Sequence, residues 1–392
     1  MKKTLIKALI IFYILIPIMN VQALELNSEY AILYNLNEDK IIYEKNAYDK
    51  IKIASLTKIM TTIVALENIE DIKQTTTIKE EALIGLEDYA TTDIKPNEEI
   101  TYEDLLYGIM LPSGADCANG IAINISGSID NFVELMNKKA QELNMTNTHF
   151  SNPIGADEDN YSSVSDIAKL LKYALKNEEF YKIFTTREYI TTNNVKLEST
   201  IVEKSTPHNI DTSLILGSKT GFTDDAGNCL ASISKQNGIN YLLVTAKAPI
   251  TNSYHIIDAQ QTYEYYKNNY SYKKILQYNK PIKTVKVKEG IRQTYEIKSD
   301  EDIYLYLNND VDINNLTYEF EGIEKIDKNT KKIGSLKIKN NDDILYTYDI
   351  LSNDKITFYN EKLYILSLAL IILITLLILL KKVNQNNLHK NK

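Results

Sequence analysis

A serine and a lysine three residues apart carry the first chemical signal in this chain. Hydrolysis of an amide needs a nucleophile, a base that removes its proton, and donors for the developing oxyanion. The segment Ser55-Leu56-Thr57-Lys58 supplies the first two. If a helix begins at Ser55, Lys58 lies one turn later on the same face, and the helix N-terminus favours negative charge at Ser55.

This spacing alone is not specific. Three other serines, Ser232, Ser271 and Ser352, are also followed by Lys three residues later. Taken alone, Ser55 could be a helix cap and Lys58 a solvated side chain. The two residues become a candidate active site only in combination with motifs further along the chain.

Two such motifs occur in a fixed order. Ser113-Gly114 comes directly after a helix candidate, and Lys219-Thr220-Gly221 occurs once, before a strand-like run. Alone, the first is an ordinary turn and the second could be a strand edge. Together, the order S-x-x-K, Ser-containing turn, K-T-G is the signature set of active-site-serine enzymes that react with penicillin.

The sequence resembles the D-alanyl-D-alanine carboxypeptidase family of low-molecular-mass penicillin-binding proteins well beyond these motifs. Family counterparts exist for residues 101–118, for 152–163 and for 219–227, and the resemblance covers about 29–270. It implies an α/β (α+β) serine β-lactamase/penicillin-binding-protein-like transpeptidase fold. It also implies a small all-β domain and a C-terminal membrane attachment, in that order.

The resemblance implies a role for each motif residue. Ser55 attacks the carbonyl of the penultimate D-Ala of a peptidoglycan stem peptide and releases the terminal D-Ala. Lys58 is the general base, and Ser113 relays a proton to the leaving amine. Lys219 keeps the site cationic. On the same strand Thr220 helps to hold the substrate carboxylate, Gly221 completes the motif, and the N–H groups of Phe222 and Ser55 form the oxyanion hole.

The same resemblance implies that a β-lactam is trapped covalently at Ser55. The physical chemistry sets one demand on this assignment. A free Lys titrates near ~10.4, so Lys58 can act as a base only if its pKa falls by several units. Burial and the neighbouring charge of Lys219 both lower that pKa, and the same cationic pocket attracts a substrate that ends in a carboxylate.

Two positions depart from the family pattern. The middle motif usually reads Ser-x-Asn, but its third position here is Ala115. An Arg that pairs with the substrate carboxylate is common before the closing helix, and His255 occupies that region here. His255 would be a weaker, pH-dependent cation, or else a surface or packing residue. We expect these two departures to affect catalytic efficiency and substrate preference.

Two other functions remain open at this point. One is a β-lactamase on the same fold, although nothing here resembles the Glu-containing loop of that class. The other is a catalytically silent wall-binding protein that kept the fold, for which Ala115 is the supporting feature.

Composition excludes some classes of partner. The formal net charge of −8 argues against nucleic acid, which needs a concentrated basic surface. His149, His208 and His389 have no metal-ligand spacing. We therefore expect no metal and no cofactor, and the acidic run Asp157-Glu158-Asp159 is interpreted as a solvated loop.

Both ends of the chain carry membrane signals. Lys2, Lys3 and Lys7 precede an apolar run that ends in Val21-Gln22-Ala23, a pattern typical of a signal peptide cleaved after Ala23; an uncleaved anchor is the alternative. Residues 363–380 are apolar and uncharged, and Lys381-Lys382 follow. This pattern predicts a single C-terminal transmembrane helix, with the catalytic domain outside the cell membrane.

The predicted organisation has five parts: signal peptide 1–23, peptidase domain 24–271, small β-rich domain 272–360, transmembrane helix 361–382 and cytoplasmic tail 383–392. In the peptidase domain the patterns predict hairpins around residues 37–39 and 237–238 and helices over 55–66, 101–111 and 256–268. A disulfide between Cys117 and Cys229 is permitted in an exported protein, and its geometry is left open.

Overall fold

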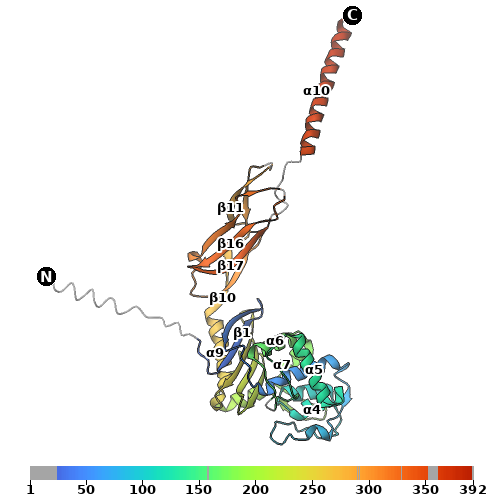
Figure 1. Cartoon of the computed structure of the whole chain (residues 1–392), viewed down its shortest axis with the longest axis vertical. Coiled ribbons are helices and arrows are strands. Elements are labelled where there is room, and N and C mark those ends of the chain that lie inside the picture. Colours follow the sequence, from blue (N-terminus) through green and yellow to red (C-terminus); the bar gives the residue numbers. More distant parts are fainter. Residues whose placement is uncertain are drawn as a thin grey trace, which may run out of the picture. The chain divides into compact units, whose positions relative to one another are not determined.

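The computed structural model describes residues 24–156, 159–288, 290, 292–327, 329–351 and 361–390. The chain divides into two compact units, Met1–Asn268 and Asn269–Lys392 (Figure 1). The expected signal peptide, Asp157 and Glu158 of the acidic run, and residues 352–360 of the expected β-rich domain lie outside the described residues, as do the last two residues of the expected tail.

The first unit is built on one antiparallel sheet. Its five strands lie in the order β2-β1-β9-β8-β7. Their bounds are β1 Tyr30–Asn35, β2 Lys40–Lys45, β7 Gly217–Thr223, β8 Gly227–Gln236 and β9 Ile239–Ala248. Both predicted hairpins are confirmed: β1 pairs with β2, and β8 pairs with β9 across Asn237-Gly238, where both residues have positive φ as a tight hairpin requires.

The rest of the first unit consists of helices and short strands. The helices are α2 Thr57–Asn68, α3 Tyr102–Met110, α4 Ala115–Ser126, α5 Ile129–Glu142, α6 Val164–Ala174, α7 Glu178–Thr185, α8 Thr200–Ser205 and α9 Tyr254–Asn269. The short elements are β3 Thr75–Thr76, β4 Ile100–Thr101, β5 Glu188–Ile190 and β6 Lys196–Glu198, with 3-10 turns η1 Ala54–Leu56, η2 Glu80–Leu83, η3 Thr206–His208 and η4 Thr251–Ser253. The three predicted helices are present as α2, α3 and α9.

Sequence explains why these helices form where they do. Helix α3 begins after Thr101, whose hydroxyl accepts from the N–H of Asp104 while the Asp104 carboxylate accepts from the N–H of Thr101. Such a reciprocal cap satisfies donors that a helix N-terminus leaves free. Helix α2 is buried on most of its surface, and it packs in one continuous core with side chains of α3, α4 and α6. The S-x-x-K motif therefore lies on an element held by a large apolar core.

The second unit is β-rich. Its strands are β10 Tyr270–Leu276, β11 Pro281–Val287, β12 Thr294–Lys298, β13 Ile303–Asn308, β14 Thr317–Gly322, β15 Lys325–Ile326, β16 Lys332–Asn340 and β17 Asp343–Leu351, with one 3-10 turn, η5 Ile313–Asn315. They form separate small sheets around their own core, which includes Val285, Ile326 and Ile338. The β-rich region expected after the catalytic part is thus confirmed.

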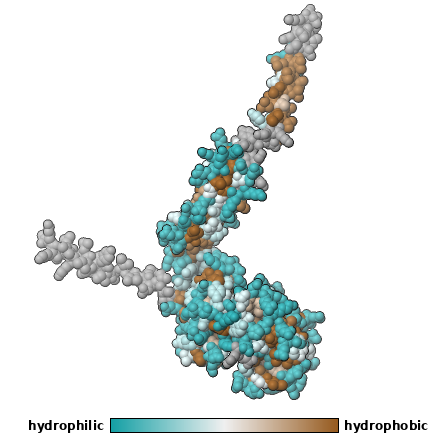
Figure 2. All heavy atoms as spheres, viewed as in Figure 1, coloured by the Kyte–Doolittle hydropathy of each residue, from teal (hydrophilic) through white to brown (hydrophobic). Residues whose placement is uncertain are grey.

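Helix α10 (Glu361–Lys390) closes the described chain. Within it, Leu363–Lys382 has a mean hydropathy of 3.1, and none of it is buried inside the protein. Figure 2 shows this stretch as a band of hydrophobic residues. By length and composition the segment is able to cross a membrane.

Candidate active site

Ser55 lies on the short 3-10 turn η1, immediately before α2. The predicted helix start at Ser55 is therefore two residues early, since regular α-helix begins at Thr57. Ser55 is partly exposed, whereas Ala54, Leu56 and Lys58 around it are buried. A substrate can reach the serine hydroxyl while the residues behind it stay out of water.

Lys58 points its side chain back at this serine. Its Nζ donates to the Oγ of Ser55 at 3.1 Å and to the carbonyl oxygen of Ile154 at 2.9 Å. Burial lowers the pKa of Lys58 to about 7, against an opposing influence from the charge of Asp116. A lysine with this pKa is substantially neutral at physiological pH, which is what a general base requires.

Ser113 occupies a strained turn between α3 and α4. Its φ is 69°, in the left-handed region that costs a non-glycine residue roughly 1–2 kcal/mol. The Oγ of Ser113 accepts from the Nζ of Lys219 at 3.0 Å. The turn therefore aims this hydroxyl at the strand that carries the K-T-G motif.

Lys219, in the middle of β7, is 1% exposed and also donates to the carbonyl oxygen of Thr220 at 2.9 Å. Burial lowers its pKa well below the usual range, and the charges of Lys58 and Lys204 lower it further. Buried ammonium groups that lie near one another disfavour each other's charge. The negative charge of a carboxylate entering the site would favour the charged forms of Lys58 and Lys219.

The K-T-G strand comes close to the nucleophile. A Cβ at Gly221 would lie 3.1 Å from the backbone nitrogen of Ser55, so a side chain there would require η1 or β7 to shift by a few tenths of an ångström. The Thr220 hydroxyl pairs with that of Thr200 on α8 at 2.7 Å. The next residue, Phe222, has an exposed side chain. This agrees with the expectation that only its backbone N–H takes part in the oxyanion hole.

The segment that follows α5 closes the other side of the nucleophile. Gly155 has a φ of 84°, and a Cβ there would collide with the carbonyl oxygen of Ala54. The Oδ1 of Asn152 accepts from the N–H groups of Ile154, Gly155 and Ala156 at 3.2, 2.9 and 3.1 Å. This turn holds the Ile154 carbonyl against Lys58, a contact that the S-x-x-K motif could not reveal.

His255 resolves one of the alternatives left open by the sequence. It lies in α9, is fully buried, and neither ring nitrogen has a hydrogen-bond partner among the described residues. Burial lowers its pKa to about 3, and the charge of Lys204 adds to this. Of the two alternatives, the structure supports the packing residue: His255 is buried in α9, and its lowered pKa disfavours a cation there.

Lys204 on α8 is a cation that the sequence motifs do not reveal. Its Nζ lies 6.0 Å from the ring centroid of Phe222, and its charge acts on Lys219. Burial lowers its pKa, partly offset by Glu203. Within the described part of the chain it forms no ion pair. No motif marked it, because its place beside β7 depends on the packing of α8.

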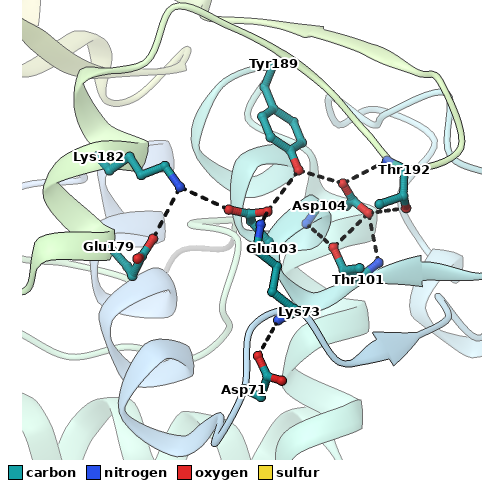
Figure 3. Close-up of polar contacts among 9 residues, drawn as sticks. All are labelled: Asp71, Lys73, Thr101, Glu103, Asp104, Glu179, Lys182, Tyr189 and Thr192. Atoms are coloured by element: carbon teal, nitrogen blue, oxygen red, sulfur yellow. Dashed lines mark hydrogen bonds and ion pairs between the residues drawn. The ribbon is translucent and has the colours of Figure 1, made fainter.

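A separate polar cluster fixes the start of α3, the helix that leads to Ser113 (Figure 3). Glu103 accepts from Lys73 and, at 3.2 Å, from Lys182. Asp104 accepts from the hydroxyls of Tyr189 at 3.0 Å and Thr192 at 2.6 Å. These contacts tie α3 to α7 and to the β5–β6 hairpin.

The two cysteines are free and buried, so the structure contains no Cys117–Cys229 disulfide. Among the residues that the structure describes, no group of His, Cys, Asp or Glu side chains could hold a metal ion. The structure brings together the hydroxyl of the partly exposed Ser55, the buried amine of Lys58 in contact with it, and the Ser113–Lys219 hydroxyl–amine pair. This arrangement suits acyl transfer through a covalent intermediate.

Comparisons with known proteins agree with this chemistry. The sequence model of the D-alanyl-D-alanine carboxypeptidase family matches residues 18–249. The chain is 29% identical over 324 residues to the D-alanyl-D-alanine carboxypeptidase DacF of Bacillus subtilis, with 80% of this chain and 82% of that protein covered. It is 31% identical over 234 residues to the D-alanyl-D-alanine endopeptidase of Escherichia coli, covering 57% of this chain and 72% of that protein.

Solved structures show the same architecture. The D-alanyl-D-alanine carboxypeptidase DacD from Francisella tularensis superposes with a TM-score of 0.69 at 20% identity, covering 86% of this chain and 95% of that one. Penicillin binding protein 5 from Haemophilus influenzae gives 0.65 at 23% identity, covering 85% and 98%. At these identities the likeness concerns the fold, and it confirms the expected fold class.

Proposed function

The chain belongs to the D-alanyl-D-alanine carboxypeptidase family of serine peptidases, and from that premise we propose that Ser55 is the nucleophile that removes the terminal D-Ala from peptidoglycan stem pentapeptides. One observation carries the proposal. The buried Lys58, with a pKa lowered to about 7 by burial, donates to the Oγ of the partly exposed Ser55 at 3.1 Å. A neutral amine in that place removes the serine proton as the hydroxyl attacks.

Acylation follows from the geometry. The Oγ of Ser55 bonds to the carbonyl carbon of the penultimate D-Ala, and its proton passes to the Nζ of Lys58. The N–H groups of Ser55 and Phe222 stabilise the oxyanion. When the intermediate collapses, the C–N bond breaks and the amine of the terminal D-Ala leaves with the proton that Lys58 took up, relayed through the Ser113 hydroxyl. Lys219 contacts that hydroxyl at 3.0 Å. Water then hydrolyses the acyl-enzyme.

The free carboxylate of the substrate is bound beside the middle of β7. Thr220 supplies a hydroxyl, and Lys219 with Lys204 supplies positive charge. Lys204 takes the place expected of His255, because it lies beside Phe222 and forms no ion pair within the described residues. A β-lactam carries a carboxylate as well, so it binds the same groups and acylates Ser55 covalently.

Membrane attachment is part of the proposal. The apolar segment Leu363–Lys382 of α10 anchors the protein, the catalytic unit faces the outside of the cytoplasmic membrane, and residues 1–23 are removed as a signal peptide. We propose that the mature chain has a peptidase domain over 24–271, a small β-rich domain over 272–360, and a short cytoplasmic tail over 383–392. Mass spectrometry of the mature N-terminus tests the cleavage, and loss of membrane sedimentation on truncation after residue 360 tests the anchor.

Endopeptidase activity is a second candidate. The relative from Escherichia coli that covers 57% of this chain is named a D-alanyl-D-alanine endopeptidase. In a cross-link the amine of a second stem peptide takes the place of the terminal D-Ala, so the leaving group is bulkier. Incubation with a cross-linked muropeptide dimer separates the two, because release of monomers reveals endopeptidase action.

Labelling with a fluorescent penicillin tests the proposed function. We expect a covalent adduct on Ser55 in the full-length protein in detergent, no adduct in Ser55→Ala, and release of free D-Ala from a stem pentapeptide. No adduct in the wild-type protein would favour a silent wall-binding protein. Fast turnover of the penicillin with little D-Ala release would instead favour a β-lactamase.

A further inference from the structure

The segment between β9 and α9 makes a contact with α8 that the mechanism above does not use. The hydroxyl of Ser253 donates to the carbonyl oxygen of Lys204 at 3.0 Å. Lys204 lies in the last turn of α8, where the carbonyl groups have no partner within the helix. Ser253 is only 9% exposed. The serine therefore supplies a buried hydrogen bond to the end of this short helix, at the residue that carries the proposed carboxylate-binding cation.

The other end of α8 is bonded to β7, and this fixes the side of the helix on which Lys204 lies. The Thr200 hydroxyl pairs with that of Thr220 at 2.7 Å, and the Thr200 N–H donates to the carbonyl oxygen of Leu111 at 3.1 Å. Residues four apart share one face of a helix, so Lys204 lies on the face that Thr200 turns toward β7. In agreement, the Nζ of Lys204 lies 6.0 Å from the ring centroid of Phe222.

The position of Ser253 depends on an unusual backbone. Asn252 and Ser253 both have positive φ, 58° and 51°, in a region that non-glycine residues seldom occupy. Two successive residues in this region persist only when their surroundings hold them. On the side of the sheet, the Nδ2 of Asn228 in β8 donates to the carbonyl oxygens of Pro249 and Ile250 at 2.9 and 3.2 Å. The chain that leads to Ser253 is thus bonded to β8, while the Ser253 hydroxyl is bonded to α8.

We propose that Ser253 is a positioning residue for carboxylate recognition, whose hydroxyl holds the end of α8 so that Lys204 stays beside β7. This inference rests on the proposed function, in which Lys204 contributes charge to the binding of the substrate carboxylate. The region before α9, where the family commonly has an Arg, then takes part in carboxylate binding without a cation of its own.

The test compares a stem pentapeptide that has a free terminal carboxylate with the same peptide after amidation of that carboxylate, using the full-length protein in detergent. The ratio of the two kcat/KM values measures recognition of the carboxylate. In Ser253→Ala we expect this ratio to fall about 3- to 10-fold, the size that the loss of one hydrogen bond produces. A general loss of folded protein would lower both rates and leave the ratio unchanged.

A double-mutant cycle connects the effect to Lys204. In Lys204→Gln the amine is gone, so the addition of Ser253→Ala should not lower the ratio further. Thr206→Ala is the matched control, because the Thr206 hydroxyl donates to the carbonyl oxygen of Val202 at 2.7 Å, at the same end of α8 but not to Lys204. We expect this control to keep the wild-type ratio.

Three results in folded variants overturn the inference. One is an unchanged ratio in Ser253→Ala, and another is a further fall of the ratio when Ser253→Ala is added to Lys204→Gln. The third is an equal fall in Thr206→Ala, since any loosening of α8 would then be enough. If Ser253→Ala does not fold, Ser253→Gly carries the same expectation, because glycine accepts the positive φ. Failure of both variants to fold assigns Ser253 a purely structural role and also overturns the inference.

Two further results separate this inference from the proposed function. A wild-type ratio in Lys204→Gln removes the carboxylate role of Lys204, and the inference with it, but leaves Ser55 as the proposed nucleophile. Absence of both penicillin acylation and D-Ala release in the wild-type protein contradicts the proposed function itself.

Discussion

The Nζ of Lys58 lies 3.1 Å from the Oγ of Ser55, yet the serine is partly exposed and the lysine is 3% exposed. The two partners of this hydrogen bond therefore differ in their access to solvent. In the proposed mechanism the nucleophile Ser55 can meet a substrate, while the base Lys58 stays in an environment that disfavours its charge. Each consequence of the relationship can be measured.

The pH dependence of acylation follows from Lys58. Burial lowers its pKa to about 7, so protonation below that value removes the base. We expect the rate of penicillin acylation to fall about tenfold per pH unit below roughly pH 7, with an apparent pKa that belongs to the coupled Lys58–Lys219 pair. Stopped-flow fluorescence across this range measures the limb. A profile that stays flat to about pH 5 would contradict the assignment of Lys58 as base.

Gly155→Ala should damage the site without touching a catalytic side chain. The new methyl group collides with the carbonyl oxygen of Ala54, and the φ of 84° disfavours any non-glycine residue. We expect acylation to slow at least about tenfold and the unfolding free energy to fall by about 1–3 kcal/mol. Gly127→Ala is the control, since it has a similar φ of 83° with open space around it. Equal effects of both substitutions on acylation would argue against the collision.

Lys204→Gln tests carboxylate recognition. Loss of one charge-assisted contact should lower kcat/KM for a stem pentapeptide by about 10- to 100-fold. A peptide whose terminal carboxylate is amidated lacks that charge, so its slow turnover should not fall further in the variant. His255→Asn changes no charge and serves as the comparison. A loss of equal size with both peptides would mean that Lys204 acts on the fold and not on the carboxylate.

Asp104→Asn should weaken the hydrogen bonds that hold the start of α3 and so lower the stability of the protein. Burial alone would raise the pKa of Asp104, but hydrogen bonds from Thr192, Thr101 and Tyr189 outweigh it and lower the pKa. A lowered folded-state pKa means that the stabilisation is present above the unfolded value of ~3.9 and is lost as pH falls below it. We expect a Tm lower than wild type near pH 7 and a difference that shrinks toward about pH 3. A pH-independent difference in Tm would show that packing, not charge, is responsible.

Much of the fold followed from local patterns. The hairpin of β1 and β2, the pair β8 and β9, and the helices α2, α3 and α9 were all predicted, because turn residues and apolar periodicity act over a few residues. The start of α2 was placed two residues early, since the turn at Ala54–Leu56 is 3-10 and its form depends on the contact with Gly155.

The sequence by itself determined the proposed nucleophile, its proposed base and the K-T-G strand, because residue type and order are enough to name them. Only the tertiary structure decided the burial and the neighbours of the groups outside these motifs. The Ile154 carbonyl, the buried and neutral His255, the cation Lys204 and the carboxylate of Asp116 come from segments far apart in the chain. Burial and charge proximity set protonation, and neither exists until those segments pack together.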